Sequence, residues 1–347
     1  MSVSIKDVAR VAGVSPTTVS HVVSGRRPVS DETRRKVQKT MAELGYVPMR
    51  SARNLALGRT MLIGLLVPDI GNAFFAELTK GVERTAASHG YNVILANTGF
   101  DRQSALTHLE LVHSRAVDGV VYSAGSPFTD DEIMAAIGDL PLVTVDETVT
   151  ASAAPLITSD NYNGGVLVAR HLLELGHRSA LVLHAAPGLE SSESRVRGFA
   201  DEWARGGGAP LQQADGGFTY EGGRDAFHRC LEDDPSRGWT AVFATNDEMA
   251  LGALRVCHER RIDVPGEIAI AGFDDIPAGR TSGPALTTVS QNVAEMGEIA
   301  CSYLIKKLNG EALPDSTMPL PVALLVREST LYAHAPQPSE RSDHGDE

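Results

Sequence analysis

Short, continuous apolar runs recur along most of this chain, and they constrain its fold more than any other feature. The runs are of strand length and lack alternating polar positions, which is typical of parallel strands buried on both faces. Helical stretches of roughly 10–15 residues separate most of them, as in βαβ units. The pattern therefore predicts an α/β region built on parallel sheets. The predicted strands are residues 61–68, 91–97, 119–123, 142–146, 179–184, 240–245 and 267–275.

The extent of this α/β region predicts two lobes instead of one. It covers about 270 residues, and single hydrophobic cores rarely grow beyond about 250–300 residues. The short strand PLIT is followed by DNYNG at 160–164, which suits a helix start, so we place the boundary there. The predicted limits are about 61–159 and 291–318 for lobe 1, about 160–290 and 319–334 for lobe 2, and 335–347 for a disordered polar tail.

The first 45 residues have the pattern of three short helices. Ser4 suits the start of the first helix, and Gly13 suits its end because glycine readily adopts the left-handed conformation. Ser15, followed by a proline, is a typical start for the second helix. Ser30 caps the third helix, and Gly45 ends it. A helix, a tight turn and a capped second helix together predict a helix-turn-helix motif.

The second helix of such a motif lies in the major groove of DNA. Its valines face inward, which leaves short hydroxyl side chains for phosphates, and Thr17 and His21 for base edges. The alternative is a small helical domain whose outer face is merely solvated. The predicted DNA contacts of this motif are Ser15, Pro16, Thr17, Thr18, Ser20 and His21.

The distribution of charge supports the DNA interpretation. The whole chain has a formal net charge of −13, which by itself disfavours a nucleic-acid partner. Residues 1–60, however, carry 11 Lys and Arg against 4 Asp and Glu, a net charge of +7, and the rest of the chain carries −20. A basic module joined to an acidic body indicates a nucleic-acid or membrane partner for the basic part.

Other features disfavour several classes of protein. No uncharged apolar run is long enough to span a membrane, and the first residues lack the apolar stretch of a signal peptide, so we expect a cytoplasmic protein. Cys230, Cys257 and Cys301 are widely spaced and predict reduced core thiols. The chain lacks a dinucleotide fingerprint, a P-loop, a zinc-protease motif and a nucleophile elbow. We therefore predict no enzyme activity, no cofactor and no metal.

The sequence resembles a known family. The block SIKDVARVAGVSPTTVSHVVSG, followed by RRPVSDETRRKVQKTMAELGYVPMRSARNLALGRT, is similar to the start of the lactose/galactose-repressor (LacI/GalR) family of bacterial transcription regulators. The similarity continues at VPDIGNAFFAEL, SDNYNGG, TNDEMALGAL and GFDDIPAG. It implies a multidomain chain with an all-α helix-turn-helix head at 1–47, a hinge helix at 48–60, and an α/β body at 61–334 like the type I periplasmic binding proteins, with two parallel-sheet lobes.

The resemblance also implies how the head reads DNA. Pro16, Thr17 and His21 occupy the base-reading positions of the recognition helix. The family commonly has Arg at the position of His21, and Arg pairs with guanine through two hydrogen bonds, whereas neutral histidine offers one donor and one acceptor. The resemblance therefore gives no expectation for the operator sequence that this chain prefers.

The hinge segment SARNLALG is too short to be stable as an isolated helix, which needs roughly 12–15 residues. The resemblance implies that it folds on DNA, paired with the same segment of a second copy. Leu55 stands at the position of an apolar wedge that opens a base step, with Arg53 and Asn54 along the same minor groove. The alternative for Leu55 is a linker leucine that packs on the body.

Polar and aromatic residues gather where the predicted strands end, and ligands of open α/β sheets bind beyond those carboxyl ends. Carboxylates and amides suit sugar hydroxyls, and aromatic rings suit the apolar face of a sugar. From position and resemblance together, we predict effector contacts at Asp69, Asn72, Phe74, Phe75, Asp146, Arg195, Phe218, Asn246, Asp274 and Gln291.

Each of these residues also has a structural interpretation. Asn72 suits a turn, Phe74 and Phe75 suit a core, and Arg195 suits an ion pair with a carboxylate. Gln291, at the crossover LTTVSQ, either contacts the ligand or braces the hinge between the lobes.

Taken together, the sequence predicts a DNA-binding transcription regulator, a repressor, that responds to a small-molecule effector such as a sugar. Two recognition helices in successive major grooves imply a homodimer and a palindromic double-stranded operator. In the family that this chain resembles, lactose-repressor tetramers use an extra C-terminal helix with an apolar heptad pattern. The polar tail has no such pattern, so we expect dimers. The alternatives are a sugar-binding receptor without DNA function, which leaves the basic head unexplained, and an α/β enzyme, which lacks a catalytic constellation.

Overall fold

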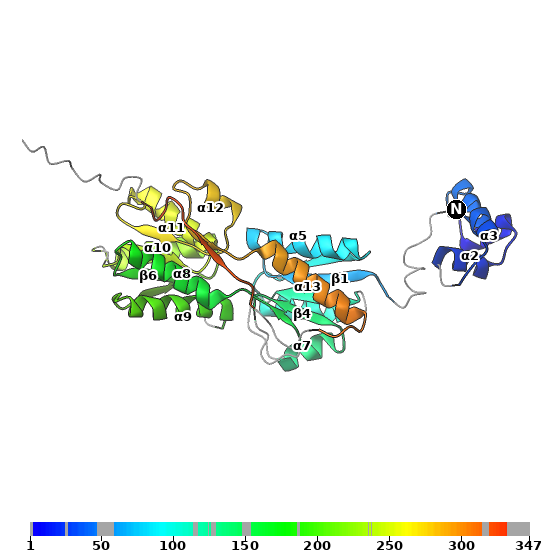
Figure 1. The fold of residues 1–347 in the computed structure, drawn as a ribbon, viewed down its shortest axis with the longest axis horizontal. Helices are drawn as coiled ribbons and strands as arrows, with labels where there is room; N and C mark the ends of the chain where they lie inside the picture. Colours follow the sequence, from blue (N-terminus) through cyan, green and yellow to red (C-terminus); the bar gives the residue numbers. More distant parts are fainter. Residues whose placement is uncertain are drawn as a thin grey trace, which may run out of the picture.

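The computed structural model describes most of the head and the body. The described residues are 3–24, 27–46, 59–113, 117–123, 125, 130–147, 154–185, 188–234, 236, 238–313 and 319–331. They form a helical head and an α/β body of two lobes (Figure 1). The predicted tail at 335–347 and the predicted hinge contacts Arg53, Asn54 and Leu55 lie outside the described residues.

The head contains three helices: α1 Ile5–Ala12, α2 Pro16–Ser24 and α3 Asp31–Glu43. The predicted caps of α1 are confirmed, because Ser4 and Asp7 form a capping box and Gly13 has a φ of 63°. A small core that includes Val8, Val19 and Val37 joins the three helices. α2 is thereby held against α1 and α3 with its other face outward.

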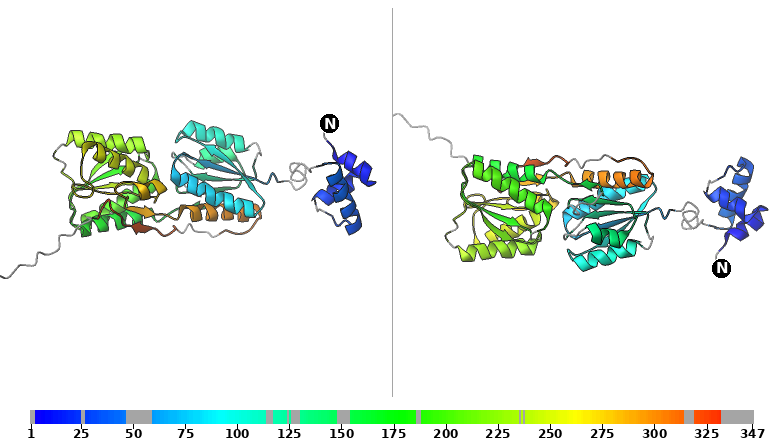
Figure 2. Two further views of the ribbon diagram at one scale, coloured as in Figure 1. Left: turned by 90° about the horizontal axis from the view of Figure 1, so that it is seen from above. Right: turned by 90° about the horizontal axis from the view of Figure 1, so that it is seen from below.

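Lobe 1 is a five-stranded sheet of order β2-β1-β3-β4-β5, in which every pair is parallel. Helices α5 and α13 pack on one face of the sheet, and α6 and α7 pack on the other (Figures 1 and 2). The strands are β1 Leu62–Val67, β2 Asn92–Asn97, β3 Gly119–Ser123, β4 Leu142–Val145 and β5 Leu156–Ile157. The helices are α5 Ala73–Ser88, α6 Arg102–His113, α7 Asp130–Ile137 and α13 Val293–Leu308.

Lobe 2 is a four-stranded parallel sheet of order β7-β6-β8-β9. Helices α8 and α9 cover one face, and α10 and α11 cover the other. The strands are β6 Ala180–His184, β7 Gln212–Asp215, β8 Ala241–Ala244 and β9 Ala269–Ala271. The helices are α8 Asn161–Glu174, α9 Glu190–Arg205, α10 Tyr220–Asp233, α11 Asp247–Arg260 and the short α12 Pro277–Thr281.

The chain crosses between the lobes at three places. It first passes from β5 in lobe 1 to α8 in lobe 2. It returns through β10 Thr288–Ser290 to α13, and it crosses again through β11 Ala323–Leu325, which pairs with β10 in antiparallel fashion. Side by side, these crossovers form a hinge on one side of the body (Figure 2).

The predicted strands are all present, with two instructive differences. Strand β7, QQAD, was not predicted, because it lies at a sheet edge and its residues are mostly polar. The run at 91–97 forms β2, but the expectation that both faces are buried is wrong there. β2 is the edge strand of lobe 1, and Ile94 and Leu95 remain 44% and 40% exposed.

Glycines let the helix that carries Arg195 pack very closely on its neighbour. A Cβ atom built on Gly198 of α9 would lie 1.9 Å from the carbonyl oxygen of Tyr162 in α8, and one on Gly165 would lie 2.1 Å from the carbonyl oxygen of Arg195. Neither distance is tolerable for a larger residue. The backbone of α9 is therefore fixed against α8, and with it the position of Arg195.

Candidate functional site: a pocket between the lobes and a DNA-reading head

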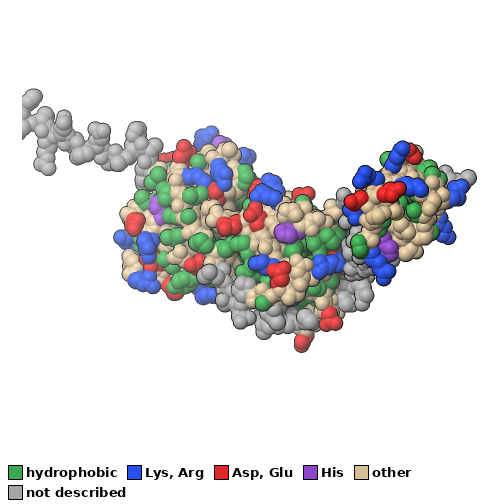
Figure 3. Space-filling view, turned by 45° about the vertical axis from the view of Figure 1, so that its right-hand side comes forward, with side chains coloured by type: hydrophobic (Ala, Val, Ile, Leu, Met, Phe, Trp, Pro, Cys, Tyr) green, Lys and Arg blue, Asp and Glu red, His purple; other side chains and the backbone are tan. Residues whose placement is uncertain are grey.

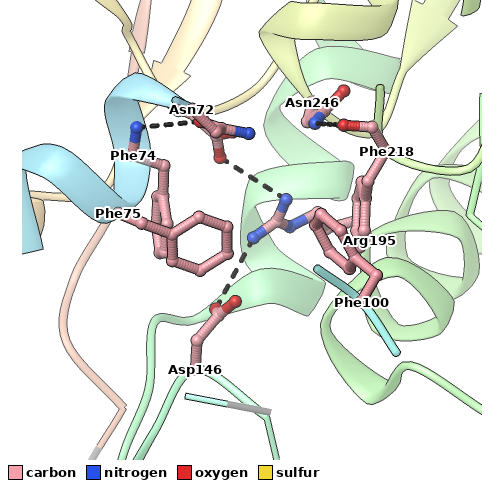
Figure 4. A pocket seen from close by; sticks show the side chains of 9 residues that line it. Asn72, Phe74, Phe75, Phe100, Asp146, Arg195, Phe218 and Asn246 are labelled. Carbon is pink, nitrogen blue, oxygen red and sulfur yellow. Dashed lines mark hydrogen bonds and ion pairs between the residues drawn. The ribbon is translucent and has the colours of Figure 1, made fainter. Parts of the chain in front are cut away.

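A pocket lies between the lobes, at the carboxyl ends of the strands (Figure 4). Lobe 1 contributes Asn72, Phe74, Phe75, Phe100 and Asp146, and lobe 2 contributes Arg195, Phe218, Asn246 and Asp274. The cavity volume is about 30 Å³, whereas one water needs roughly 10–15 Å³ by this measure. Binding of a ligand larger than a few waters therefore requires the lobes to separate or the side chains to move.

Arg195 is the central residue of the pocket and is only 2% exposed. Its Nε donates to Asn161 Oδ1 at 2.8 Å, and its Nη1 donates to the carbonyl oxygen of Thr245 at 2.7 Å. Its Nη2 lies 3.4 Å from Gln291 Oε1. The guanidinium also stacks on the Phe273 ring, 3.9 Å from the centroid. These contacts fix the guanidinium in one orientation, as a preorganised site requires.

Two buried carboxylates face this single cation. Asp274 Oδ1 lies 3.5 Å from Arg195 Nη1, and Asp146 Oδ1 lies 3.8 Å from Arg195 Nη2. Burial raises the pKa of both carboxyls, and Arg195 opposes the rise without cancelling it. Among the described residues, Asp146 Oδ1 has no hydrogen-bond donor. A ligand hydroxyl in the pocket is a suitable donor for this oxygen.

The three amide residues of the predicted site have structural as well as lining roles. Asn72 caps α5 by accepting from the backbone N–H of Phe74 at 2.9 Å, and Asn246 caps α11 by accepting from that of Met249 at 3.0 Å. Gln291 is fully buried and donates to Asp274 Oδ1 at 2.5 Å. Gln291 braces Arg195 and Asp274 from behind and does not line the pocket.

Of the ten predicted effector contacts, eight line the pocket. Besides Gln291, Asp69 stays outside the lining, where it accepts from the backbone N–H of Gly71 in the turn before α5. One lining residue, Phe100, was not predicted from the sequence. It lies three residues after β2, and an aromatic residue soon after a strand end was the signal that drew attention to Phe74 and Phe75.

A second contact between the lobes lies beside Asp146. Glu147, at the end of β4 in lobe 1, accepts from the Ser191 hydroxyl and, at 3.3 Å, from the Ser191 backbone N–H in lobe 2. Leu189, at the cap position of α9, supplies no side-chain hydrogen bond, so Glu147 takes that role across the cleft. Burial and the neighbouring Asp146 raise the pKa of Glu147 to about 7.

The head presents the predicted DNA contacts on the outer side of α2. Ser15 accepts from the backbone N–H of Thr18 at 3.0 Å and shares a 2.9 Å hydrogen bond with the Thr18 hydroxyl. Ser15, Pro16 and Thr17 are exposed, and Thr18, Ser20 and His21 are half-buried. Lys and Arg side chains are scattered around the visible face of the head, with a few Asp and Glu among them (Figure 3). The described part of the head thus presents small polar side chains within a basic surface.

The described ranges contain neither a membrane-spanning helix nor a cluster of metal-binding side chains. In these ranges, no helix is both long and apolar enough to cross a membrane. Likewise, no cluster of three or more His, Cys, Asp or Glu in them could hold a metal ion. Cys230, Cys257 and Cys301 are all buried, in agreement with the prediction of core thiols.

Comparisons with known proteins give a consistent result. Residues 4–49 match the model of bacterial regulatory proteins of the lacI family, and residues 169–330 match the periplasmic binding protein-like domain. The chain is 33% identical to catabolite control protein A of Priestia megaterium, over 95% of this chain and 100% of that protein. It is 34% identical to the ribose operon repressor of Haemophilus influenzae, over 94% and 98% of the two chains.

Solved structures agree with the relatives. A lac repressor dimer bound to operator and an anti-inducer has a TM-score of 0.84 at 28% identity, with 96% of this chain and all of that chain covered. A LacI-family regulator from Enterococcus faecium with bound ribose has a TM-score of 0.69 at 28% identity, with 78% and 98% covered. The fold of the head and of the body agrees with these matches, and the chain belongs to the lacI family of DNA-binding transcription regulators.

Proposed function

We propose that this protein is a homodimeric repressor whose binding to a palindromic operator is controlled by a monosaccharide in the pocket between the lobes. The observation that carries the proposal is the arrangement of Arg195 between Asp146 and Asp274, with phenylalanine rings around them. Carboxylates and amides bind neighbouring hydroxyl groups, and the rings cover the apolar face of a sugar. The boundaries of the head, hinge and lobes given above are part of this proposal.

The charges in the pocket favour a neutral effector over a phosphorylated one. Each nitrogen of the Arg195 guanidinium is already directed at a protein oxygen, from Asn161, Thr245 or Gln291. The two carboxylates outnumber this cation, so an anionic ligand would be repelled. A neutral polyol donates its hydroxyl hydrogens to the carboxylates instead. The names of the relatives support this choice, since one is a ribose operon repressor and one solved structure holds ribose.

The dimer is supported by the exposed edge of lobe 1. β2 ends the sheet, and Ile94 and Leu95 point to its opposite faces with more than a third of each side chain exposed. Ile70, also exposed, is bonded through its backbone N–H to Asn97 at the end of β2. Edge strands of this kind are usually covered. A second copy of the chain is the proposed cover, and it supplies the second recognition helix.

The linker that leads to the head is attached firmly to lobe 1. Arg59 donates to the carbonyl oxygen of Leu308 at 2.7 Å and to Asn309 Oδ1 at 3.1 Å, at the end of α13. Asp118 accepts from the backbone N–H groups of Thr60 and Met61. A rotation of lobe 1 therefore moves the end of the hinge segment 48–60 that joins the body. The effector controls DNA binding if it binds unequally to the two lobe arrangements.

The proposal is tested by thermal shift and gel shift on the same preparation. A panel of pentoses, hexoses, nucleobases and sugar phosphates should give its largest rise in melting temperature with a neutral monosaccharide. That sugar should also change the affinity for a palindromic operator, and binding should weaken steeply with salt. Specific sugar binding without any operator binding would support the receptor alternative instead. A preference for a sugar phosphate would contradict the effector class.

The hinge proposal has a separate test. Leu55→Ala should lower operator affinity about tenfold or more, because insertion of an apolar side chain stabilises the kinked duplex. Affinity for the effector should stay nearly unchanged, since the pocket is formed by other residues. Gel shift and calorimetry measure the two affinities. Unaltered operator affinity would reject the wedge role.

A further inference from the structure

We propose that Phe100 is a specificity-determining effector contact, the lobe 1 counterpart of Phe218 in lobe 2. The inference rests on the proposed function, since it concerns the same pocket and the same monosaccharide. It adds a residue that the sequence pattern did not identify. It also implies that the sugar meets one aromatic ring from each lobe.

The two sheets correspond strand by strand. Their orders are β2-β1-β3-β4-β5 and β7-β6-β8-β9, so that β2 corresponds to β7 and β4 corresponds to β9. Asp146 follows β4, and Asp274 lies three residues after β9, and both face Arg195. Phe100 and Phe218 each lie three residues after their strands, β2 and β7. The pocket is thus lined by two related pairs, one carboxylate and one phenyl ring from each lobe.

The turns that hold the two phenylalanines have the same geometry. Gly99 and Phe100 have φ values of 68° and 57°, and Gly217 and Phe218 have values of 60° and 59°. In each turn the residue after the phenylalanine caps a helix. Asp101 accepts from the backbone N–H of Ser104 at 2.6 Å, and its counterpart Thr219 accepts from that of Gly222 at 3.0 Å.

The backbone conformation of Phe100 indicates a functional constraint. A bulky residue other than glycine rarely adopts positive φ, and it does so at a cost that commonly marks a binding site. Four of the nine residues that line the pocket share this feature: Phe100, Asp146, Phe218 and Asp274. Three of them were already predicted effector contacts from their positions in the sequence. Phe100 has the same backbone signature and lines the same pocket.

The alternative for Phe100 is a purely structural role at the start of α6. An apolar residue before a helix cap often packs on the fourth residue of that helix, here Ala105 of α6. Ala105, however, belongs to the core on the α6 side of the sheet, whereas Phe100 packs against the core on the α5 side. There its ring meets Phe75 edge-on, with the centroids 6.3 Å apart. The ring is thus directed to the pocket side and away from its own helix.

The consequence is a limit on the size of the effector. With Phe74 and Phe75 on α5, Phe100 encloses the lobe 1 side of a pocket that is already small. A free monosaccharide suits this enclosure better than a glycoside with a bulky substituent. Phe100 should therefore contribute both to affinity for the sugar and to discrimination against its larger derivatives.

The test is a substitution that keeps the backbone conformation and removes the ring. Phe100→Asn is suitable because asparagine tolerates positive φ. The matched control is Arg261→Asn, since Arg261 is exposed at the end of α11 with a φ of 58° and does not line the pocket. Calorimetry with D-ribose and D-glucose, and with the methyl and nitrophenyl glycosides of whichever binds, gives affinity and selectivity. Phe100→Leu, which keeps most of the volume, serves as a second variant.

Phe100→Asn should weaken binding of the free sugar about tenfold or more and reduce its advantage over the glycosides, because an apolar contact is lost. Phe100→Leu should lose less, and Arg261→Asn should behave as wild type. The melting temperature without sugar reports whether each variant is folded. If wild type binds the sugar and folded Phe100→Asn binds it equally, this inference is wrong while the proposed function stands. If wild type binds no monosaccharide, both are overturned.

Discussion

At the scale of single residues, the pocket is governed by buried charge. Arg195 lies between the buried side chains of Asp146 and Asp274. The pKa values of both carboxyls are raised because burial outweighs the attraction of one cation. The aspartates therefore depend on Arg195 for their charged form. In the proposed function, a sugar hydroxyl that donates to them would stabilise the same form and so link effector binding to this ion cluster.

Arg195→Met should abolish measurable sugar binding and lower the free energy of unfolding by about 3 kcal/mol at neutral pH, because it leaves two carboxylates buried without a cation. The loss should become smaller as the pH is lowered, because protonated carboxyls do not need a cation beside them. The control is Arg197→Met, two residues along α9, whose side chain is 53% exposed and which pairs with Glu190. It should cost less than about 1 kcal/mol. Urea unfolding measures the loss of unfolding free energy in both variants, and equal losses would contradict the prediction.

Glu147 gives a prediction about pH. Its pKa is raised from 4.5 to about 7, so the folded state holds a proton that the unfolded state loses, and its contribution to stability falls as pH rises from about 4.5 to 7. Glu147→Gln removes this titration and should be more stable than wild type at pH 8, by up to about 3 kcal/mol, with a smaller difference at pH 5. Urea titrations at both pH values measure it. The control is Glu110→Gln at an exposed position in α6. Its difference in stability from wild type should be the same at pH 5 and at pH 8.

At the scale of elements, helix ends position the residues that carry function. Asn72 and Asn246 cap helices and line the pocket at the same time. Glu147 in lobe 1 caps α9 of lobe 2 at Ser191. Arg195 lies four residues further along the same helix. A local capping interaction is therefore part of the contact between the lobes. Closure of the cleft and order at the start of α9 should change together.

The caps of the head allow a matched comparison. Ser15→Ala removes the cap of the recognition helix α2, and Ser30→Ala removes that of α3, whose side chain accepts from the Thr33 backbone N–H. Each should lower the stability of the head by about 1 kcal/mol. Ser15→Ala should also weaken operator binding more than Ser30→Ala does, since α2 is the helix predicted to enter the major groove. Equal operator affinities for the two folded variants would place the DNA contacts elsewhere.

At the scale of the whole molecule, charge and symmetry decide how the protein meets DNA. The net charge of +7 on residues 1–60 is attracted to phosphates, and the −20 of the remainder is repelled. Only the head and the hinge are then expected to touch the duplex. In the proposed dimer, affinity for the operator depends on holding two small heads at the spacing of its half-sites.

Leu95→Glu tests the dimer surface, because it places a charge on the exposed edge strand β2. Sedimentation velocity should show wild type as a dimer and the variant as a monomer, with operator affinity reduced about tenfold or more and sugar affinity retained. The control is Leu111→Glu on α6, where the side chain is 63% exposed. It should remain dimeric. A wild-type tetramer, or a dimeric Leu95→Glu, would require another interface.

Some features followed from the sequence by itself because they depend on neighbouring residues. The apolar runs fixed the strands, the serine and glycine caps fixed the helices of the head, and the ends of the runs located most of the pocket residues. Each signal lies within a few residues of the structure it predicts. The uneven charge along the chain was equally readable, since it needs only counting.

Other features were decided only by the tertiary structure, because they depend on residues far apart in the chain. The edge position of β2 left Ile94 and Leu95 exposed, and no local pattern distinguishes an edge strand from a central one. Glu147 reaches Ser191, 44 residues away, only because two lobes meet there. Phe100 lines the pocket because its ring packs on the α5 side of the sheet, against Phe75, and not on its own helix α6. The raised pKa values of Asp146, Glu147 and Asp274 likewise depend on burial, which the tertiary structure creates.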